Sequence, residues 1–315
     1  RSLGGQGPRA LMRAQAAAAL AALQSADPPP RHYARAADPG RPLAYVGLRS
    51  RDLAFAVNYA GDLMGADLLQ LAAENTRQLL RSSPASAAGE HTSESSELAS
   101  RGWLLAGIAN RTGGKLICDE LPALWSSLRG LYDNTSRFRD GLAFSAAPTV
   151  TGLDTVMSSG HDTLLSLQHV QALDALAGAA QRWGCGGGMV AQLRAAQSSI
   201  TTALRGPLLE NRTTGMFRPS SGNNAKLTDV WGSALAVDLG AVAGEREARV
   251  VAWFGENWPK VFQDGQVRHL PLVFGSVGGT PGAGGTPVGE YFPNLTTWAY
   301  QTHSNGGYWA EASGW

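Results

Sequence analysis

The sequence predicts an all-α fold, an α/α barrel made of helices in successive antiparallel pairs. Apolar residues recur at helical spacing in segment after segment, and turn-forming residues separate these segments. Strands do not alternate with helices along the chain, which argues against a parallel α/β sheet. With 43% hydrophobic and 16% charged residues in 315, the chain can bury a large core. We therefore expect paired helices whose loops surround a cleft at one rim.

The chain is predicted to begin with a helix that lies outside the barrel. Pro8–Gln24 is rich in Ala and Leu, and three prolines at 28–30 follow it. Proline cannot continue a helix, so a helix should end before this run. We expect residues 1–42 to form a helix and a Pro-rich linker packed on the domain, and residues 43–315 to form the barrel.

Two helices are expected at the start of the barrel. Asp52–Met64 and Asp67–Arg81 carry apolar residues at helical spacing, with Asp67 as a candidate N-terminal cap. Ser82–Ser96 is rich in Ser, Ala and Glu and has little to bury. It is predicted to be an exposed excursion.

Six further helices share the same spacing. They are expected over Leu98–Ile108, Leu121–Tyr132, Asp162–Trp183, Met189–Leu204, Asp229–Val242 and Ala248–Trp258. Thr228 or Asp229 is expected to cap the fifth of them, and Pro259 to stop the sixth. The connections are predicted as turns, loops or a short hairpin at Asn110–Gly114, Gly184–Gly188, Leu208–Phe217 and Gly275–Gly289.

The charge balance excludes several classes of function. Lys and Arg number 26 against 25 Asp and Glu, a net charge of +1, which disfavours nucleic-acid or membrane-surface binding. No apolar run reaches the roughly 18–20 residues of a membrane span. The Cys and His spacings do not match a zinc site, and Gly186–Gly188 lacks the Gly-Lys-Ser/Thr of a phosphate loop. We expect no metal and no cofactor.

The sequence favours an extracellular or secretory location. It contains four Asn-x-Ser/Thr glycosylation acceptors, at Asn110, Asn134, Asn211 and Asn294. All four lie beside turn-like sequence, as an accessible acceptor must. The two cysteines, Cys118 and Cys185, can form one disulfide or remain as free buried thiols.

The segment Tyr300–Trp315 has the composition of a sugar-binding site. It combines four Tyr or Trp residues with paired glycines, two amides and a carboxylate. Aromatic faces stack on the apolar faces of sugars, while amides and carboxylates bond their hydroxyls. The alternative is a Trp-rich turn in the core.

Five segments, in this order, resemble the six-hairpin glycosidase superfamily, in its amylo-glucosidase-like and glucosylceramidase-like branch. They are Arg49-Ser50-Arg51-Asp52, Thr151–Val156, Thr228–Val237, Gly265–Pro271 and Tyr300–Trp315. The resemblance covers about residues 43–315 and implies an (α/α)6 toroid that hydrolyses glycosidic bonds without a cofactor.

The chain departs from that family in three places. Leu48 or Arg49 stands where the family's Trp-x-Arg-Asp segment has its aromatic residue. Thr302-His303-Ser304 interrupts the family's Tyr-Gln-Asn-Gly segment. The family domain continues beyond the position of Trp315, so the toroid is expected to be incomplete at the C-terminus.

Glycoside hydrolysis needs a general acid and a second carboxylate that serves as base or nucleophile. Asp154 is the candidate acid, because its apolar neighbours would keep it protonated; the alternative is a helix cap or turn residue. Glu311 and Glu290 are candidates for the second carboxylate. Asp52 is a third candidate, or a structural partner of a neighbouring arginine. The candidate substrate-binding residues are Asp52, Trp231, Arg268, His269, Gln301, Asn305, Tyr308 and Trp309.

Two functions follow from these features. The first is a secreted glycoside hydrolase that cleaves a glucosidic or related bond with a carboxylate pair. The second is a catalytically inactive glycoprotein that binds glycans or forms part of an extracellular assembly with other chains. The changed Arg-Asp segment and the interrupted Tyr-Gln-Asn-Gly segment favour the second.

Overall fold

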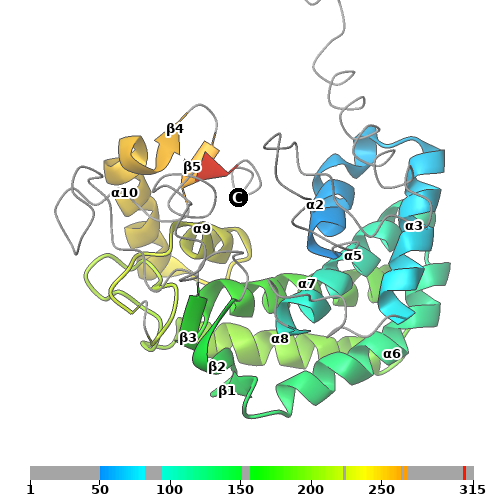
Figure 1. Cartoon of the computed structure of the whole chain (residues 1–315), viewed down its shortest axis with the longest axis horizontal. Helices are drawn as coiled ribbons and strands as arrows, with labels where there is room; N and C mark the ends of the chain where they lie inside the picture. The colour runs from blue at the N-terminus through cyan, green and yellow to red at the C-terminus, as the bar shows by residue number, and fades with distance from the viewer. Residues whose placement is uncertain are drawn as a thin grey trace, which may run out of the picture. The chain divides into compact units, whose positions relative to one another are not determined.

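The computed structural model describes residues 50–81, 94–150, 157–222, 225–263, 266–268 and 308–309. The described chain is mostly helical, as the sequence predicts (Figure 1). The expected N-terminal helix, the boundary at residue 42 and the Gly275–Gly289 loop lie outside the described residues.

The chain divides into two compact units. Unit 1 comprises Arg1–Glu90, Glu97–Ser127 and Ala172–Leu193, and unit 2 comprises His91–Ser96, Leu128–Gln171 and Arg194–Trp315. The boundaries fall inside four long helices, which are α5 (Glu94–Thr112), α6 (Lys115–Tyr132), α7 (Thr163–Trp183) and α8 (Met189–Arg205).

The described part of unit 1 begins with the helices predicted at the start of the barrel. Helix α2 (Ser50–Ala60) and the 3-10 turn η1 (Gly61–Leu63) together cover the predicted segment from Asp52. Helix α3 (Ala66–Arg81) follows, with Asp67 inside its first turn and therefore not at the cap position. The carboxylate still lies beside the free N–H groups of the helix start, where negative charge is favourable.

Helix α5 is longer than predicted at both ends. It begins at Glu94, and Ser95 and Ser96 are only 5% and 1% exposed, so the predicted exposed excursion is wrong for its last three residues. Their polar atoms can be buried because hydrogen bonds satisfy them; the Ser95 hydroxyl, for example, bonds His169 Nε2 at 2.9 Å. The following turn is shorter than predicted, because α5 runs to Thr112 and leaves only Gly113 and Gly114 outside a helix.

The core of unit 1 also contains a buried ion pair. The Arg101 Nε lies 2.9 Å from the Glu97 carboxylate, and these side chains are 2% and 4% exposed. The Ser50 hydroxyl donates to the same carboxylate oxygen. Two donors on one carboxylate offset the desolvation that isolated buried charges would suffer. This contact ties the start of α2 to α5.

Unit 2 contains an antiparallel sheet that the helical spacing did not predict. Its strands β1 (Phe138–Arg139), β2 (Leu142–Val150) and β3 (Met157–His161) pair in chain order. Asp140 and Gly141 form the turn between the first two strands, with φ angles of 52° and 75°. Asp-Gly at such a two-residue turn is a strong hairpin signal, and it was available in the sequence.

The described part of unit 2 after α8 includes two more helices and a second small sheet. They are α9 (Val230–Asp238), α10 (Gly244–Val261), β4 (Phe262–Gln263), β5 (Gln266–Arg268) and β6 (Tyr308–Trp309). Helix α9 ends before the predicted Val242, because Gly240 adopts a φ of 60° and the Ala241 N–H bonds back to the Ala236 carbonyl at 2.8 Å. This is the usual way in which a glycine ends a helix.

Helix α10 continues through Pro259, so the predicted stop at this proline is wrong. Proline removes one N–H donor near the end of the helix, a loss that the remaining turn tolerates. The predicted hairpin near residues 208–217 is confirmed by an antiparallel bridge between Glu210 and Phe217. Arg246 of α10 holds this hairpin, because its guanidinium lies 4.0 Å from the Phe217 ring centroid and its Nε donates to the Gly215 carbonyl at 3.1 Å.

Candidate functional site

The segment Phe217–Ser221 joins the starts of α7 and α9 within unit 2. Its first residue forms an antiparallel bridge with Asp229, immediately before α9, and Ser220 forms one with Asp162, immediately before α7. The Thr163 N–H also donates to the Pro219 carbonyl at 3.1 Å. The two helix starts are therefore attached to the same short segment.

Helix α7 is capped by Asp162, whose Oδ1 accepts the Leu165 N–H at 2.7 Å. The Ser166 hydroxyl donates to the Asp162 carbonyl and accepts the N–H of Ala143 in strand β2 at 3.1 Å. The Asp162 N–H returns to the Ala143 carbonyl at 2.9 Å. The N–H and the carbonyl of Ala143 in β2 are therefore both hydrogen-bonded to the start of α7.

Helix α9 is capped in the same way by Asp229. Its Oδ1 accepts the Gly232 N–H at 2.7 Å. The Ser233 hydroxyl donates to the Asp229 carbonyl and accepts the Phe217 N–H at 2.9 Å. The Asp229 N–H bonds the Phe217 carbonyl at 2.9 Å. Both helix starts therefore use an Asp-x-x-x-Ser spacing against a neighbouring extended segment. The structure confirms Asp229 as the cap of α9, in place of the alternative Thr228.

The two cap carboxylates are buried and interact electrostatically. Asp162 is 5% exposed and Asp229 is 1% exposed. Burial raises the pKa of Asp229 to about 7; the Gly232 N–H lowers it and the negative charge of Asp162 raises it. Desolvation outweighs the favourable helix-start position because the carboxylate has almost no contact with water.

The Asp140, His161 and Ser221 side chains form a series beside these caps. His161 Nε2 lies 3.3 Å from Asp140 Oδ2, and its Nδ1 lies 3.1 Å from the Ser221 hydroxyl oxygen. Burial lowers the pKa of His161. Acyl transfer requires free donors for an oxyanion, but the Ser221 N–H bonds the His161 carbonyl and the Gly222 N–H bonds the Ser159 carbonyl. Both backbone N–H groups are therefore already bonded within the protein. The contacts among Asp140, His161 and Ser221 connect β3 to the Phe217–Ser221 segment.

His169 of α7 lies in a second buried polar group. Its Nε2 lies 2.9 Å from the Ser95 hydroxyl and its Nδ1 lies 3.0 Å from the Tyr132 hydroxyl. Burial lowers the pKa of His169 to about 3, so the imidazole is neutral at physiological pH. The role of this group is to satisfy polar atoms inside unit 2.

Three of the predicted substrate-binding residues come together in the second sheet. Strand β5 pairs with β6 in antiparallel register, with Arg268 opposite Tyr308 and Val267 opposite Trp309. Helix α9, which carries Trp231, contacts β5 (Figure 1). Segments far apart in the sequence therefore meet at one edge of unit 2. Trp231 itself is 3% exposed, the burial expected for the core-packing alternative.

The remaining predicted site residues fall outside what the structure describes. They are Asp154, His269, Glu290, Gln301, Asn305 and Glu311. Asp154 precedes strand β3, and this strand separates it from helix α7. Asp52 lies in the first turn of α2 in unit 1.

Three glycosylation acceptors lie in the described chain. Asn110 is exposed in α5 and Asn134 is exposed in a turn, whereas Asn211 is half-buried. The Ser136 hydroxyl donates to the Asn134 amide oxygen at 2.7 Å, so the acceptor and the hydroxyl of its sequon lie together. Asn294 lies outside the described residues.

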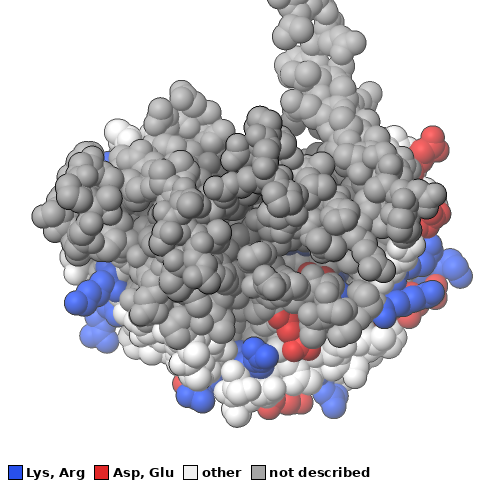
Figure 2. Space-filling model, viewed as in Figure 1, with Lys and Arg blue, Asp and Glu red and all other residues white. Residues whose placement is uncertain are grey.

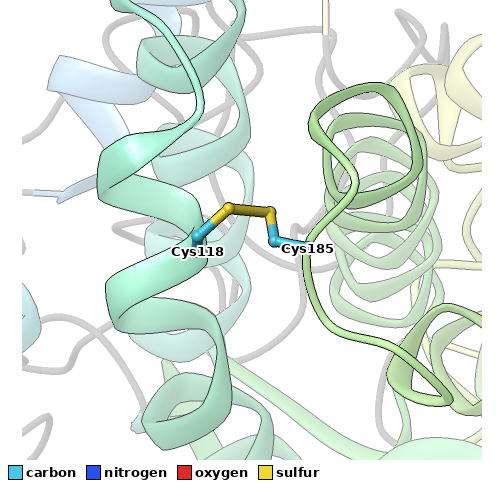
Figure 3. Close-up of a disulfide and its surroundings, with 2 residues drawn as sticks. All are labelled: Cys118 and Cys185. Carbon is cyan, nitrogen blue, oxygen red and sulfur yellow. A yellow bond between two sulfur atoms is a disulfide. The ribbon is translucent and has the colours of Figure 1, made fainter.

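The two cysteines are joined by a disulfide between α6 and the turn after α7 (Figure 3). The Cα atoms of Cys118 and Cys185 are 5.1 Å apart. Cys118 is exposed and Cys185 is half-buried, so the alternative of free buried thiols is wrong. The bond connects residues of unit 1 that are 67 positions apart in the sequence.

Charged residues of both signs are scattered over the described part of the surface that Figure 2 shows. Where described residues are visible in Figure 2, neither Lys and Arg nor Asp and Glu form a continuous patch. Within the described ranges, no group of His, Cys, Asp and Glu is arranged to hold a metal ion. None of the helices in the described part of the chain combines the length and the apolar character that a membrane span needs.

Comparison with protein-family models gives no match, and comparison with curated proteins gives none either.

Proposed function

We propose that the chain is a secreted glycoside hydrolase with an (α/α)6 toroid fold. The observation that carries the proposal is the pairing of Arg268 with Tyr308 in a sheet beside α9. Helix α9, residues 266–268 and residues 308–309, which belong to three segments that resemble six-hairpin glycosidases, are neighbours in space. Sequence order alone does not require this.

The repeated helix starts support the toroid. Asp162 with Ser166 and Asp229 with Ser233 make the same set of contacts to an extended neighbour. A toroid of helical hairpins repeats one structural unit, and each repeat must begin its inner or outer helix in a comparable environment. Such repetition would produce the same capping contacts at two helix starts.

The disulfide supports a secreted protein. Disulfides persist in oxidising compartments and are rare in the cytosol. The bond between Cys118 and Cys185, together with exposed acceptors at Asn110 and Asn134, fits passage through a secretory pathway. This context suits an enzyme that acts on extracellular carbohydrate.

In this proposal Asp154 is the general acid that protonates the leaving oxygen, and Glu311 or Glu290 supplies the second carboxylate. Asp154 belongs to the connection between β2 and β3. The end of β3 is fixed to the Phe217–Ser221 segment, because the Ser221 N–H bonds the His161 carbonyl at 2.9 Å. The connection that carries the proposed acid therefore leads into an anchored strand.

The proposal is tested by release of reducing sugar from a panel of α- and β-linked gluco-, galacto- and xylo-oligosaccharides. A glycoside hydrolase gives turnover on at least one linkage, without added metal or cofactor. Absence of turnover with a folded, glycosylated chain across the panel overturns the proposal. Circular dichroism of the same sample shows whether the chain is folded.

A non-catalytic glycan-binding glycoprotein is the second candidate function. The observation that favours it is that the carboxylates of Asp162 and Asp229 are buried and cap the starts of α7 and α9. Neither is presented to a substrate. Retarded migration in gels that contain a polysaccharide, without release of reducing sugar, is the result that this function predicts.

A further inference from the structure

Two buried carboxylates face a shared junction between α7 and α9. Asp162 and Asp229 each precede a helix, and each is bridged to the same segment, Phe217–Ser221. Helix α7 also reaches the first turn of α9, since the Thr163 Cγ2 methyl and the Asp229 carboxyl both lie against the Cα of Gly232. A Cβ atom there would lie 2.7 Å from Asp229 Cγ and 3.0 Å from that methyl group, so an added side chain would require a shift.

Two like charges in such a junction repel each other in a medium of low dielectric constant. With exposures of 5% and 1%, neither carboxylate is screened well by water. Carboxylates that share a buried site relieve this repulsion by keeping a proton. We propose that the buried Asp229 carboxyl group keeps its proton in the folded chain, beside Asp162, and that this proton keeps the starts of α7 and α9 packed together.

Other charged groups border the junction in the described structure. They are His161 at the end of β3, Arg218 and Glu210 on the segments beside Phe217, and Arg246 of α10. Arg246 and Glu210 lie 3.9 Å apart, so each offsets the charge of the other. The His161 side chain contacts Asp140 and the Ser221 hydroxyl. Asp162 is the charged group that raises the pKa of Asp229.

The proton makes the junction sensitive to pH. As the pH rises through neutrality, Asp229 loses this proton, and its negative charge is buried beside Asp162. Asp229 holds its proton to a higher pH in the folded chain than in the unfolded chain, so the stability that it contributes is lost as pH rises. Asp229 is thus a positioning residue for α9. Its effect on turnover rests on the proposed function, whereas its effect on stability does not.

The test is urea unfolding of the wild type and of Asp229→Asn at pH 5 and pH 8. Asn keeps the cap oxygen but cannot ionise. Between these pH values, we expect the unfolding equilibrium constant of the wild type to rise roughly a hundredfold relative to that of Asp229→Asn. Asp238→Asn, an exposed change at the other end of α9, is the matched control and should follow the wild type.

Parallel curves for the wild type and Asp229→Asn overturn the inference. If Asp229→Asn does not fold, the infrared band of a protonated carboxylic acid decides the matter in the wild type. The inference requires this band to persist at pH 6 and to disappear through pH 8, and its absence at pH 6 contradicts it. If turnover is absent but the stability curves diverge, only the proposed function fails.

Discussion

Ser166 and Ser233 occupy equivalent positions at two helix starts. Each hydroxyl donates to the carbonyl of the cap aspartate four residues earlier and accepts a backbone N–H from an extended neighbour, from Ala143 at 3.1 Å and from Phe217 at 2.9 Å. The same three groups, carboxylate, hydroxyl and extended backbone, are therefore used twice. They attach α7 and α9 to their neighbours.

The two serines should be equally important for stability. Ser166→Ala and Ser233→Ala each leave a buried backbone N–H without its acceptor, which costs about 1–3 kcal/mol. Urea unfolding measures the loss. Ser198→Ala, at an exposed position of α8, is the control and should change the free energy of unfolding by less than about 0.5 kcal/mol. Losses no larger than those of the control would show that the repeated device is not a stabilising element.

Gly232 should not tolerate a side chain. A Cβ atom at this position would lie 2.7 Å from Asp229 Cγ and 3.0 Å from the Thr163 methyl group. Gly232→Ala is therefore expected to destabilise the chain by about 1–3 kcal/mol. Gly130→Ala is the matched control, because Gly130 lies in helix α6 and a Cβ atom added there would meet no heavy atom within 4 Å.

Gly130→Ala should stabilise the helix by up to about 1 kcal/mol, since alanine restricts the unfolded chain and favours a helix. Thermal unfolding of the two variants should give changes of opposite sign. Equal changes would contradict the tight junction between α7 and α9.

The disulfide should stabilise unit 1. A bond that closes a loop of 67 residues restricts the unfolded chain, and its removal costs about 2–4 kcal/mol. We expect reduction with dithiothreitol to lower the urea midpoint of the wild type. A Cys118→Ser, Cys185→Ser double variant should start at the lower midpoint and not respond to the reductant. A wild-type midpoint that is unchanged by complete reduction would contradict this prediction.

His169 should make the chain sensitive to acid. Its pKa is lowered by burial to about 3 in the folded chain, from 6.5. The folded chain therefore binds fewer protons, and the stability contributed by neutral His169 is lost as pH falls from about 6.5 towards 3. Asp229 has the opposite effect, because its contribution to stability is lost as pH rises. We expect the His169→Gln variant to lose less stability than the wild type between pH 6 and pH 4, measured by tryptophan fluorescence. An unchanged acid transition would contradict the burial of a neutral imidazole.

The helices could be predicted where the core follows simple spacing. Helix α8 (Met189–Arg205) differs from its prediction by one residue, because its buried residues recur with the helical period. The start of α5 could not be predicted, since Ser95 and Ser96 are polar and are buried only through tertiary hydrogen bonds. The hairpin at Asp140-Gly141 had a sequence signal, but its first strand is too short for a clear alternating pattern.

One of the two buried helix caps was predicted from the sequence. The role of Asp229 as a helix cap follows from local sequence and is confirmed. Its electrostatic interaction with Asp162 depends on a tertiary junction that no local pattern reveals. The Asp-x-x-x-Ser spacing, present before both helices, is the signal that could have linked the two positions.

Hydrolysis of glycosidic bonds by this chain is best tested by the turnover of Asp154→Asn beside that of Asp238→Asn on the preferred oligosaccharide. We expect Asp154→Asn to lose turnover by about 10²-fold or more, because a general acid is removed, while Asp238→Asn retains it. Equal turnover in the two variants would contradict the role of Asp154. Absence of turnover in the folded wild type would contradict the hydrolase itself.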